Sequence, residues 1–138
     1  MTSIKYISTA EVIRHAQLVG FFVDWPNHPS PERHLDILRA SHGVELALDN
    51  STNQVVGFIN MISDGIFAGY IPLLEVLPEY QGKGIGKELT NRILTRYNHL
   101  YMLDVCCDDT VVPFYASKGF LNVSGMIKRN FEQQSAPT

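Results

Sequence analysis

Short apolar runs separated by turn-forming residues occupy much of the first three quarters of the chain. Runs of this length, rich in Val, Ile and Leu and bounded by Asn, Asp, Ser or Gly, are typical of β-strands. The turn residues Asn50–Asn53 and the Asp64-Gly65 pair each join two neighbouring runs, so we expect an antiparallel meander there. The pattern predicts strands over Ile4–Ile7, Val44–Asp49, Gln54–Ile62, Ile66–Leu77 and Leu100–Val105.

Two residues that disfavour regular strands interrupt the fourth of these runs. Gly69 has no side chain to pack, and Pro72 has no amide hydrogen for a ladder bond. We therefore expect a bulge, or an edge that splays away from its neighbour, in this part of the strand.

Apolar residues at helical spacing mark two longer segments. Ser30-Pro31 is typical of a helix start, with serine as the N-cap, and this helix should end near Gly43. A second helix should begin at Ile85, because apolar residues recur there every four positions as far as Tyr97. Glu88 and Arg92 form an i,i+4 pair on its polar side.

The two ends of the chain carry weaker signals. Ser8 and Glu11 fit a capping box, which predicts a helix that buries Val12, Ala16 and Val19 and ends near Gly20. Three prolines make residues 22–31 irregular. Near the C-terminus we expect a short helix capped by Asp108 or Asp109 and ended by Gly119, a strand from Phe120, and one more strand over Met126–Phe131.

Composition places the chain among globular proteins with a single core. It has 138 residues, of which 45% are hydrophobic, so we expect one domain over residues 1–131 and a flexible tail over 132–138. The net charge of −3 argues against a nucleic-acid partner. No apolar run is long enough to cross a membrane, and the first residues lack the pattern of a secretory signal.

The cysteines and histidines show none of the spacings that are typical of metal sites. Cys106 and Cys107 are adjacent, which is poor geometry for a disulfide and wrong for a Cys-x-x-Cys metal site, so we interpret them as reduced thiols of a cytoplasmic protein. The five histidines form no His-Glu-x-x-His motif. We therefore expect no metal.

A glycine-rich loop precedes the second long helix. Alternate glycines leave backbone amides uncovered, and the amides and positive dipole end of the helix face the same point, an arrangement that binds phosphate. The string is not a Walker A loop, and a tight helix entry alone would also explain the glycines. The candidate phosphate-binding residues are Gln81, Gly82, Lys83, Gly84, Ile85, Gly86 and Lys87.

Two segments resemble the GCN5-related N-acetyltransferase (GNAT) family. The first runs from Leu74 to Gly86 and is similar to the acetyl-CoA signature [QR]-x-x-G-x-[GA]; the second runs from Asp108 to Phe120 and contains Phe-Tyr followed by Lys-Gly-Phe. The resemblance implies an α/β (α+β) fold with a mixed, mostly antiparallel central sheet, a splayed strand pair and helices on both faces. It also implies acetyl-CoA as co-substrate, a small-molecule amine as acceptor and a homodimer as a candidate assembly.

The resemblance also implies roles for single residues. The backbone of Leu74 and Val76 would pair with the pantetheine arm, and Phe114 would pack against the cofactor or the core. Asp108 stands where the family commonly has asparagine, so it keeps an acceptor oxygen but loses the amide donor of that contact. The hydroxyl of Tyr115 would protonate the departing thiolate of CoA as a general acid.

The general base is less clearly marked. Relatives often carry a Glu or His at the positions of Tyr70 or Pro72, and Glu75 is the nearest carboxylate in this chain. Glu75 is our candidate base, and a water chain through Tyr70 is the alternative. For the whole protein we expect N-acetyl transfer; a non-catalytic CoA-binding or sensing domain of the same fold is the alternative.

Overall fold

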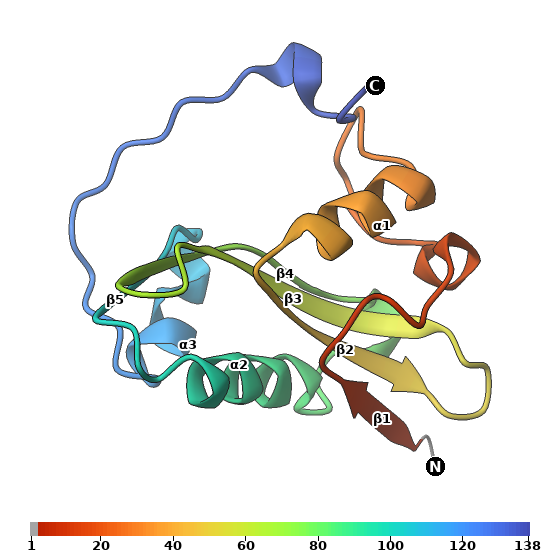
Figure 1. Ribbon diagram of the computed structural model, residues 1–138, viewed down its shortest axis with the longest axis horizontal. Helices are drawn as coiled ribbons and strands as arrows, with labels where there is room; N and C mark the ends of the chain where they lie inside the picture. The colour runs from red at the N-terminus through yellow and green to blue at the C-terminus, as the bar shows by residue number, and fades with distance from the viewer. Residues whose placement is uncertain (1–2) are drawn as a thin grey trace.

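The computed structural model describes residues 3–138, and its centre is a five-stranded sheet in the order β1-β2-β3-β4-β5. The first four strands pair antiparallel and β5 pairs with β4 in parallel, which confirms the mixed α/β fold (Figure 1). The strands are β1 (Ile4–Ile7), β2 (Gly43–Asp49), β3 (Val55–Ser63), β4 (Ala68–Val76) and β5 (Met102–Val105). The α-helices are α1 (Pro31–Ala40), α2 (Ile85–Arg96) and α3 (Val112–Ala116), and the 3-10 helices are η1 (His15–Leu18), η2 (Pro78–Tyr80), η3 (Asp109–Val111) and η4 (Phe131–Gln133).

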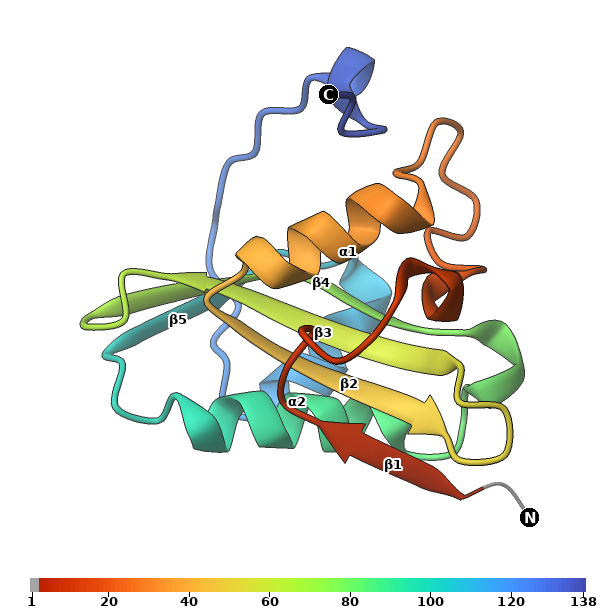
Figure 2. The ribbon, with the colours of Figure 1, turned by 45° about the vertical axis from the view of Figure 1, so that its right-hand side comes forward.

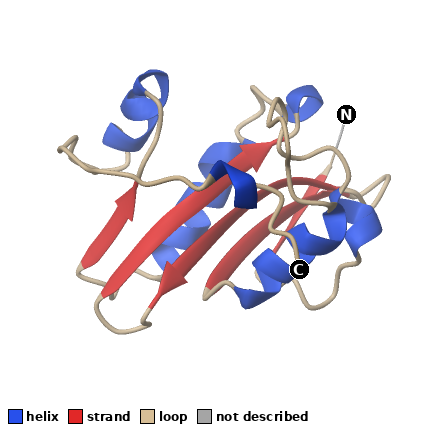
Figure 3. Ribbon diagram, turned by 90° about the horizontal axis from the view of Figure 1, so that it is seen from above, coloured by secondary structure: helices blue, strands red, loops and turns tan. Residues whose placement is uncertain are grey.

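Helices cover both faces of the sheet. Helix α1 lies over one face, and α2 and α3 lie over the other (Figure 2), while the five strands run side by side when seen from above (Figure 3). Phe58 of β3 packs against the α1 side, where its ring contacts His34. On the other face Gly57 leaves room for Ile85 and Leu89 of α2. The core therefore has two layers, one on each side of β3.

The two predicted long helices form where the apolar spacing placed them. The Ser30 hydroxyl accepts a hydrogen bond from the Arg33 amide at 3.2 Å and so caps α1. In α2, Ile85, Leu89 and Ile93 are buried against the sheet. On its exposed side the Arg92 guanidinium lies 2.7 Å from the Glu88 carboxylate.

The predicted irregularity of the fourth strand is present in β4. Its register against β3 shifts between the pairs Asn60–Leu73 and Ile62–Tyr70, so three steps in β4 match two in β3. Its pairing with β5 ends at Ile71. The β4 residues 72–76 therefore splay from β5, as the placement of Gly69 and Pro72 predicts.

The expected helix after Ser8 is wrong; only the short η1 forms there. The Ser8 hydroxyl donates to Glu45 at 2.8 Å instead of capping a helix. The Arg39 side chain donates to the carbonyls of Ala10 and Ile13, at 3.2 and 3.1 Å, which takes acceptors that a helix would have bonded to its own amides. Consequently Val12 and Val19, expected inside, are exposed, while Ile13 and Leu18 are buried.

The expected strands from Phe120 and over Met126–Phe131 are also wrong. Within residues 3–138, the sheet contains no strand after β5, and residues 120–130 run as irregular chain. The short helix before them forms as α3, and Gly119 follows with a φ of 94°. Asp108 stands at the N-cap of η3, but its side chain makes no capping bond there. The segment expected to be a tail contacts the α1 region: Gln134 Oε1 accepts from the Asn27 amide at 3.0 Å.

One histidine of the α1 layer is buried without polar partners. The ring of His34 lies 4.5 Å from that of Phe58 and 4.8 Å from that of Phe22, measured between centroids, and the residue is 1% exposed. Neither ring nitrogen has a hydrogen-bond partner. Burial therefore lowers the pKa of His34 to about 4, because a charged imidazolium would have no compensating group there.

We expect this histidine to make the fold sensitive to acid. The pKa of His34 is lower in the folded chain than its usual 6.5, so the unfolded state binds more protons between these values. The free energy of unfolding should fall by about 3 kcal/mol as the pH drops from 6.5 to 4, since each pKa unit corresponds to about 1.4 kcal/mol. Urea unfolding across this pH range measures the loss.

Two variants separate His34 from other groups that titrate in the same range. His34→Leu replaces the imidazole with an apolar side chain of similar size and should remove most of the acid-dependent loss. The control His15→Gln removes an exposed histidine that pairs with Glu32, and it should leave the loss nearly unchanged. Equal acid dependence in the His34→Leu and parent proteins would contradict this assignment.

Candidate active site

The splay between β4 and β5 opens one edge of β4. Leu74 pairs with Ile59 and Val76 with Gly57 on the β3 side, while no described residue pairs with this stretch on the β5 side. Free backbone groups at such an edge pair readily with an extended ligand that carries amides. One of these groups is already occupied: the Gln81 side-chain amide donates to the Val76 carbonyl at 3.0 Å.

The glycine-rich loop directly follows this edge. Gly82 and Gly84 have φ angles of 76° and 82°, in the left-handed region that favours glycine. Gly84 is the N-cap of α2, and no side chain caps the helix. A Cβ added at Gly82 or Gly84 would meet no atom within 4 Å. The first turn of α2 therefore has no side-chain cap, and the space beside Gly82 and Gly84 is open, which suits an anion site at a helix N-terminus.

Positive charge lies beside the loop. The Lys83 ammonium lies 5.5 Å from the centre of the Tyr80 ring, and Lys87 is exposed on the first turn of α2. The sequence did not reveal what holds this turn in place. The Tyr80 hydroxyl donates a hydrogen bond of 2.6 Å to the carboxylate of Asp49, the last residue of β2. That hydrogen bond raises the pKa of Tyr80 and lowers that of Asp49. No local sequence signal joins residues 31 positions apart.

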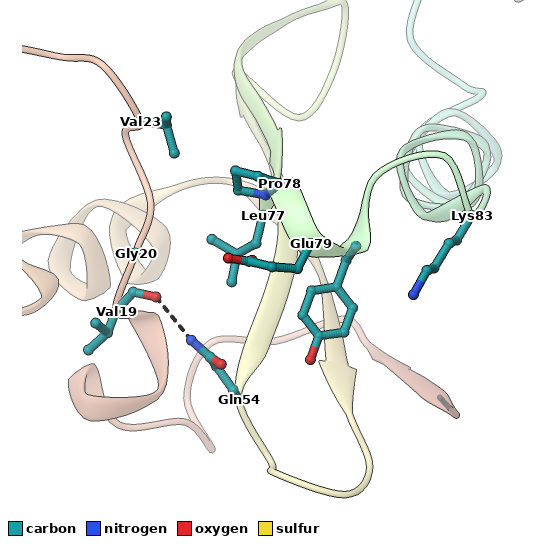
Figure 4. Close-up of a pocket in the computed structure, with 9 residues that line it drawn as sticks. Val19, Gly20, Val23, Gln54, Leu77, Pro78, Glu79 and Lys83 are labelled. Carbon is teal, nitrogen blue, oxygen red and sulfur yellow. Dashed lines mark hydrogen bonds between the residues drawn. The ribbon is translucent and has the colours of Figure 1, made fainter. Parts of the chain in front are cut away.

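A pocket of about 620 Å³ adjoins the loop on its other side (Figure 4). A hydrogen bond of 3.1 Å from the Gln54 amide to the Val19 carbonyl crosses it. Neither Tyr115 nor the splayed edge contributes to it, so it is separate from the candidate transfer site. Its lining residues are Val19, Gly20, Val23, Gln54, Leu77, Pro78, Glu79, Tyr80 and Lys83.

Tyr115 lies on α3, on the same face of the sheet as α2. The Lys118 ammonium fixes α3 to α2 by donating to Asn91 Oδ1 at 2.6 Å. The ring of Tyr115 makes edge contacts with Phe114 and Phe120 at 5.1 and 5.4 Å between centroids. Burial, with a smaller effect of Cys107, raises the pKa of Tyr115 to about 12. The phenol therefore stays protonated at neutral pH and can act only as a proton donor.

Glu75 lies on the opposite face, toward α1. Its two carboxylate oxygens accept hydrogen bonds from the amides of Phe22 and Val23, at 2.9 and 3.2 Å. Phe22 and Asp24 have φ angles of 64° and 68°, which are uncommon for residues with a side chain. Glu75 thus holds the strained loop at residues 22–24 against β4, on the α1 face of the sheet. The sequence alone did not reveal this contact.

The remaining predicted residues lie around the end of β5. Phe114 is half-buried, with the Lys118 ammonium 5.9 Å from its ring centre, and Asp108 is exposed. Tyr70, on β4, pairs with Asp104 of β5 just before the splay. Burial and the neighbouring Cys106 thiol raise the pKa of Tyr70, and the charge of Arg129 opposes this shift. Within residues 3–138 no three His, Cys, Asp or Glu side chains come together to hold a metal ion.

The comparisons with solved structures agree with this geometry. A crystal structure of a Deinococcus radiodurans R1 protein assigned as an acetyltransferase is 43% identical, with a TM-score of 0.92 over 98% of this chain and 97% of that one. A GNAT-family acetyltransferase from Streptococcus pneumoniae TIGR4 is 30% identical, with a TM-score of 0.73 over 94% and 98%.

Curated relatives are more distant and longer. An uncharacterised N-acetyltransferase from Gracilaria tenuistipitata var. liui is 29% identical over 64% of this chain, and the match spans only 56% of that relative's own length. Residues 32–131, well over half of the chain, match the family profile described as an acetyltransferase (GNAT) domain. Together with the open loop at α2 and the splayed β4 edge, this match shows that the chain belongs to the GNAT family of acetyltransferases.

Proposed function

We propose that this protein transfers the acetyl group of acetyl-CoA to the primary amine of a small molecule by direct attack in a ternary complex. The observation that carries the proposal is the succession of three features along one side of the sheet. These are the free β4 edge, the uncapped glycine entry of α2 and the protonated phenol of Tyr115.

Each part of acetyl-CoA has residues that fit it. The amides from Gln81 to Lys87, with the two lysines, suit the pyrophosphate. The free groups of β4 near Leu74 suit the pantetheine amides, and a β4 amide suits the oxygen that becomes negative during attack. Phe114 offers an apolar ring, and the exposed Asp108 offers acceptor oxygens at the end of β5. No step requires a metal ion.

The reaction requires two proton movements. The amine nitrogen forms a bond to the thioester carbon as the carbon–sulfur bond breaks, so the nitrogen loses a proton and the sulfur gains one. Tyr115 supplies the proton to sulfur. Glu75 is our candidate base, and Tyr70 with a water is the alternative. Asp104, which pairs with Tyr70 just before the splay, adds negative charge that favours a cationic acceptor.

Thiol release tests the proposal directly. The purified protein should release CoA thiol from acetyl-CoA when polyamines, aromatic amines, amino acids or aminoglycosides are supplied, and titration calorimetry should detect CoA binding without an amine. CoA binding with no thiol release from any amine would support a non-catalytic CoA-binding domain instead. Absence of CoA binding would overturn both functions.

A pH profile tests the role of Glu75. If Glu75 is the base, Glu75→Gln should lower kcat/KM for the amine by about 100-fold and remove the acidic limb of the profile. A retained acidic limb would contradict the base role and would restrict Glu75 to holding Phe22 and Val23. Circular dichroism of the variant should be unchanged, because glutamine can still accept one of the two amide bonds.

We also propose that the protein works in the cytoplasm. Cys106 and Cys107 are free and exposed, which suits a reducing compartment. In the part of the chain that the structure describes, none of the helices combines the length and apolarity needed to span a bilayer.

A further inference from the structure

Two adjacent thiols lie where β5 ends. Cys106 and Cys107 follow Val105, whose pairing with Ile71 is the last one between β5 and β4. Both cysteines are free and exposed. The chain then enters η3 and α3, and α3 carries Tyr115. The thiols therefore lie at the point where the splay opens, beside the elements of the candidate active site.

The two thiols lie on opposite sides of the sheet. Side chains alternate along a strand, so Cys106 continues the side of Tyr70 and Cys107 continues the side of Ile71. Burial raises the pKa of both tyrosines of the proposed reaction, and one thiol adds to each shift, Cys106 at Tyr70 and Cys107 at Tyr115. Each thiol is therefore close to one of these tyrosines, and Cys107 is the one beside the proton donor.

The proposed reaction brings the sulfur of CoA to the same phenol. Tyr115 can protonate the departing thiolate only within hydrogen-bond distance of it. Because Cys107 neighbours Tyr115, bound CoA would hold its own sulfur close to an exposed protein thiol. Two sulfur atoms held near each other form the arrangement that thiol–disulfide exchange requires.

We infer that Cys107 is a modification site for the disulfide form of CoA, an inference that rests on the proposed function. A CoA disulfide held by the α2 loop and the β4 edge exchanges with this cysteine. The Cys107 thiolate attacks the nearer sulfur, a protein–CoA disulfide bond forms, and the original sulfur–sulfur bond breaks. The sulfur of Cys107 is oxidised and that of the second CoA is reduced. The second CoA leaves as a thiolate and takes up the proton that Cys107 lost, so no other oxidant is needed.

The surroundings of Cys107 favour a bound disulfide over a free one. Although the residue is exposed overall, a small loss of hydration at its sulfur and the charge of Asp108 raise the pKa of Cys107. Little of it is therefore the reactive thiolate at neutral pH, and collisions with free disulfides seldom lead to exchange. A disulfide fixed against the sulfur reacts in spite of this, because its effective concentration is high.

The neighbouring thiol is poorly placed to remove the attached CoA. Adjacent Cα atoms are about 3.8 Å apart, whereas disulfides usually join Cα atoms about 4.4–6.8 Å apart. Cys106 therefore does not readily displace CoA by bonding to Cys107, and the modified chain persists until an external thiol reduces it. While CoA is attached it occupies the site of acetyl-CoA, so acetyl transfer stops.

Intact-mass spectrometry of the reduced protein after incubation with CoA disulfide tests the site. The mass should rise by that of one CoA less two hydrogens, and peptide fragmentation should place the adduct on Cys107. Cys107→Ser should remain unmodified, whereas the matched control Cys106→Ser should be modified like the parent. Both residues are exposed, so neither serine should alter the fold. An adduct on Cys106, or on neither cysteine, would overturn the assignment.

A smaller disulfide separates directed modification from chance reaction. Pantethine is the disulfide of the thiol arm of CoA and lacks the pyrophosphate, so the α2 loop cannot hold it. At equal low concentration CoA disulfide should modify Cys107 at least about tenfold faster than pantethine, and its rate should saturate as its concentration rises. Gly84→Asp should slow only the reaction with CoA disulfide. Equal rates for the two reagents would contradict modification from a bound state.

Failure of the acetyl-transfer function would look different from failure at Cys107. If the protein binds CoA in calorimetry and releases thiol with an amine but forms no adduct, only the modification at Cys107 is wrong. If it does not bind CoA, both are wrong. With the adduct in place thiol release should be abolished, and reduction with dithiothreitol should restore it; full activity of the modified chain would show that CoA is attached outside the transfer site.

Discussion

Replacing Tyr115 with phenylalanine should lower kcat by about 100- to 1,000-fold, which is the usual contribution of a positioned general acid. The variant keeps the ring that contacts Phe114 and Phe120, so it should fold normally. It loses only the hydroxyl, which has no hydrogen-bond partner among the described residues and is not sealed from solvent. The affinity for CoA should change by less than about threefold, because the hydroxyl matters only when the thiolate departs.

The direction of the pKa shift sharpens this prediction. A pKa of about 12 keeps Tyr115 protonated throughout the usual assay range, so the hydroxyl should contribute no alkaline limb below that value. Tyr6→Phe is a matched control, because it removes a hydroxyl from β1 at the far edge of the sheet. Steady-state kinetics with saturating acetyl-CoA measures both variants. Equal kcat for Tyr115→Phe and the parent would reject the proton-donor role.

The centre of the fold could be predicted because its signals are local. Apolar spacing defines α2, Ser30 with Pro31 defines the start of α1, and turn residues divide the meander. The splay could also be predicted, since Pro72 lacks the amide hydrogen that a ladder bond on both sides of the strand would need. These features depend on residues within a few positions of one another.

The failures at the two ends share a different cause. The capping signal at Ser8 does not produce a helix, because residues far along the chain bond to the groups concerned. Glu45 accepts a hydrogen bond from the Ser8 hydroxyl, and Arg39 donates to the carbonyls of Ala10 and Ile13. Residues 120–131 have the composition of strands, which is why the sequence predicts pairing there. A sequence shows the tendency to pair but not which edge supplies the partner, and here the chain's own sheet does not.

The candidate site shows the same difference between local motifs, which the sequence reveals, and long-range contacts, which it does not. Its glycines and Tyr115 stand in contiguous motifs and could be found from the sequence. The contacts that hold them in place could not, because they join Glu75 to Phe22, Tyr80 to Asp49 and Lys118 to Asn91. Glu75 illustrates the difference: the sequence shows a carboxylate near the loop, and only the fold shows that both of its oxygens already accept amide bonds.

Gly84→Asp should weaken CoA binding by about 30- to 100-fold relative to Gly84→Asn, or about 2–3 kcal/mol, because it adds a negative charge where the pyrophosphate is expected. The pair of variants isolates charge from shape. Asn and Asp have the same size, and both tolerate the left-handed conformation that Gly84 adopts at a φ of 82°. Backbone strain and the new Cβ, which meets no atom within 4 Å, are therefore common to both.

Calorimetric titration with CoA measures the difference, and salt provides a second readout. Repulsion between the aspartate and the pyrophosphate should shrink as ionic strength rises, whereas a steric effect should not. Gly86→Ala is the matched control within the same loop, because its Cβ would point toward Val76 Cγ2 at 3.8 Å, an ordinary contact inside the fold. Equal CoA affinity of the Asp and Asn variants would place the pyrophosphate away from the α2 N-terminus, and the assignment of this loop would be wrong.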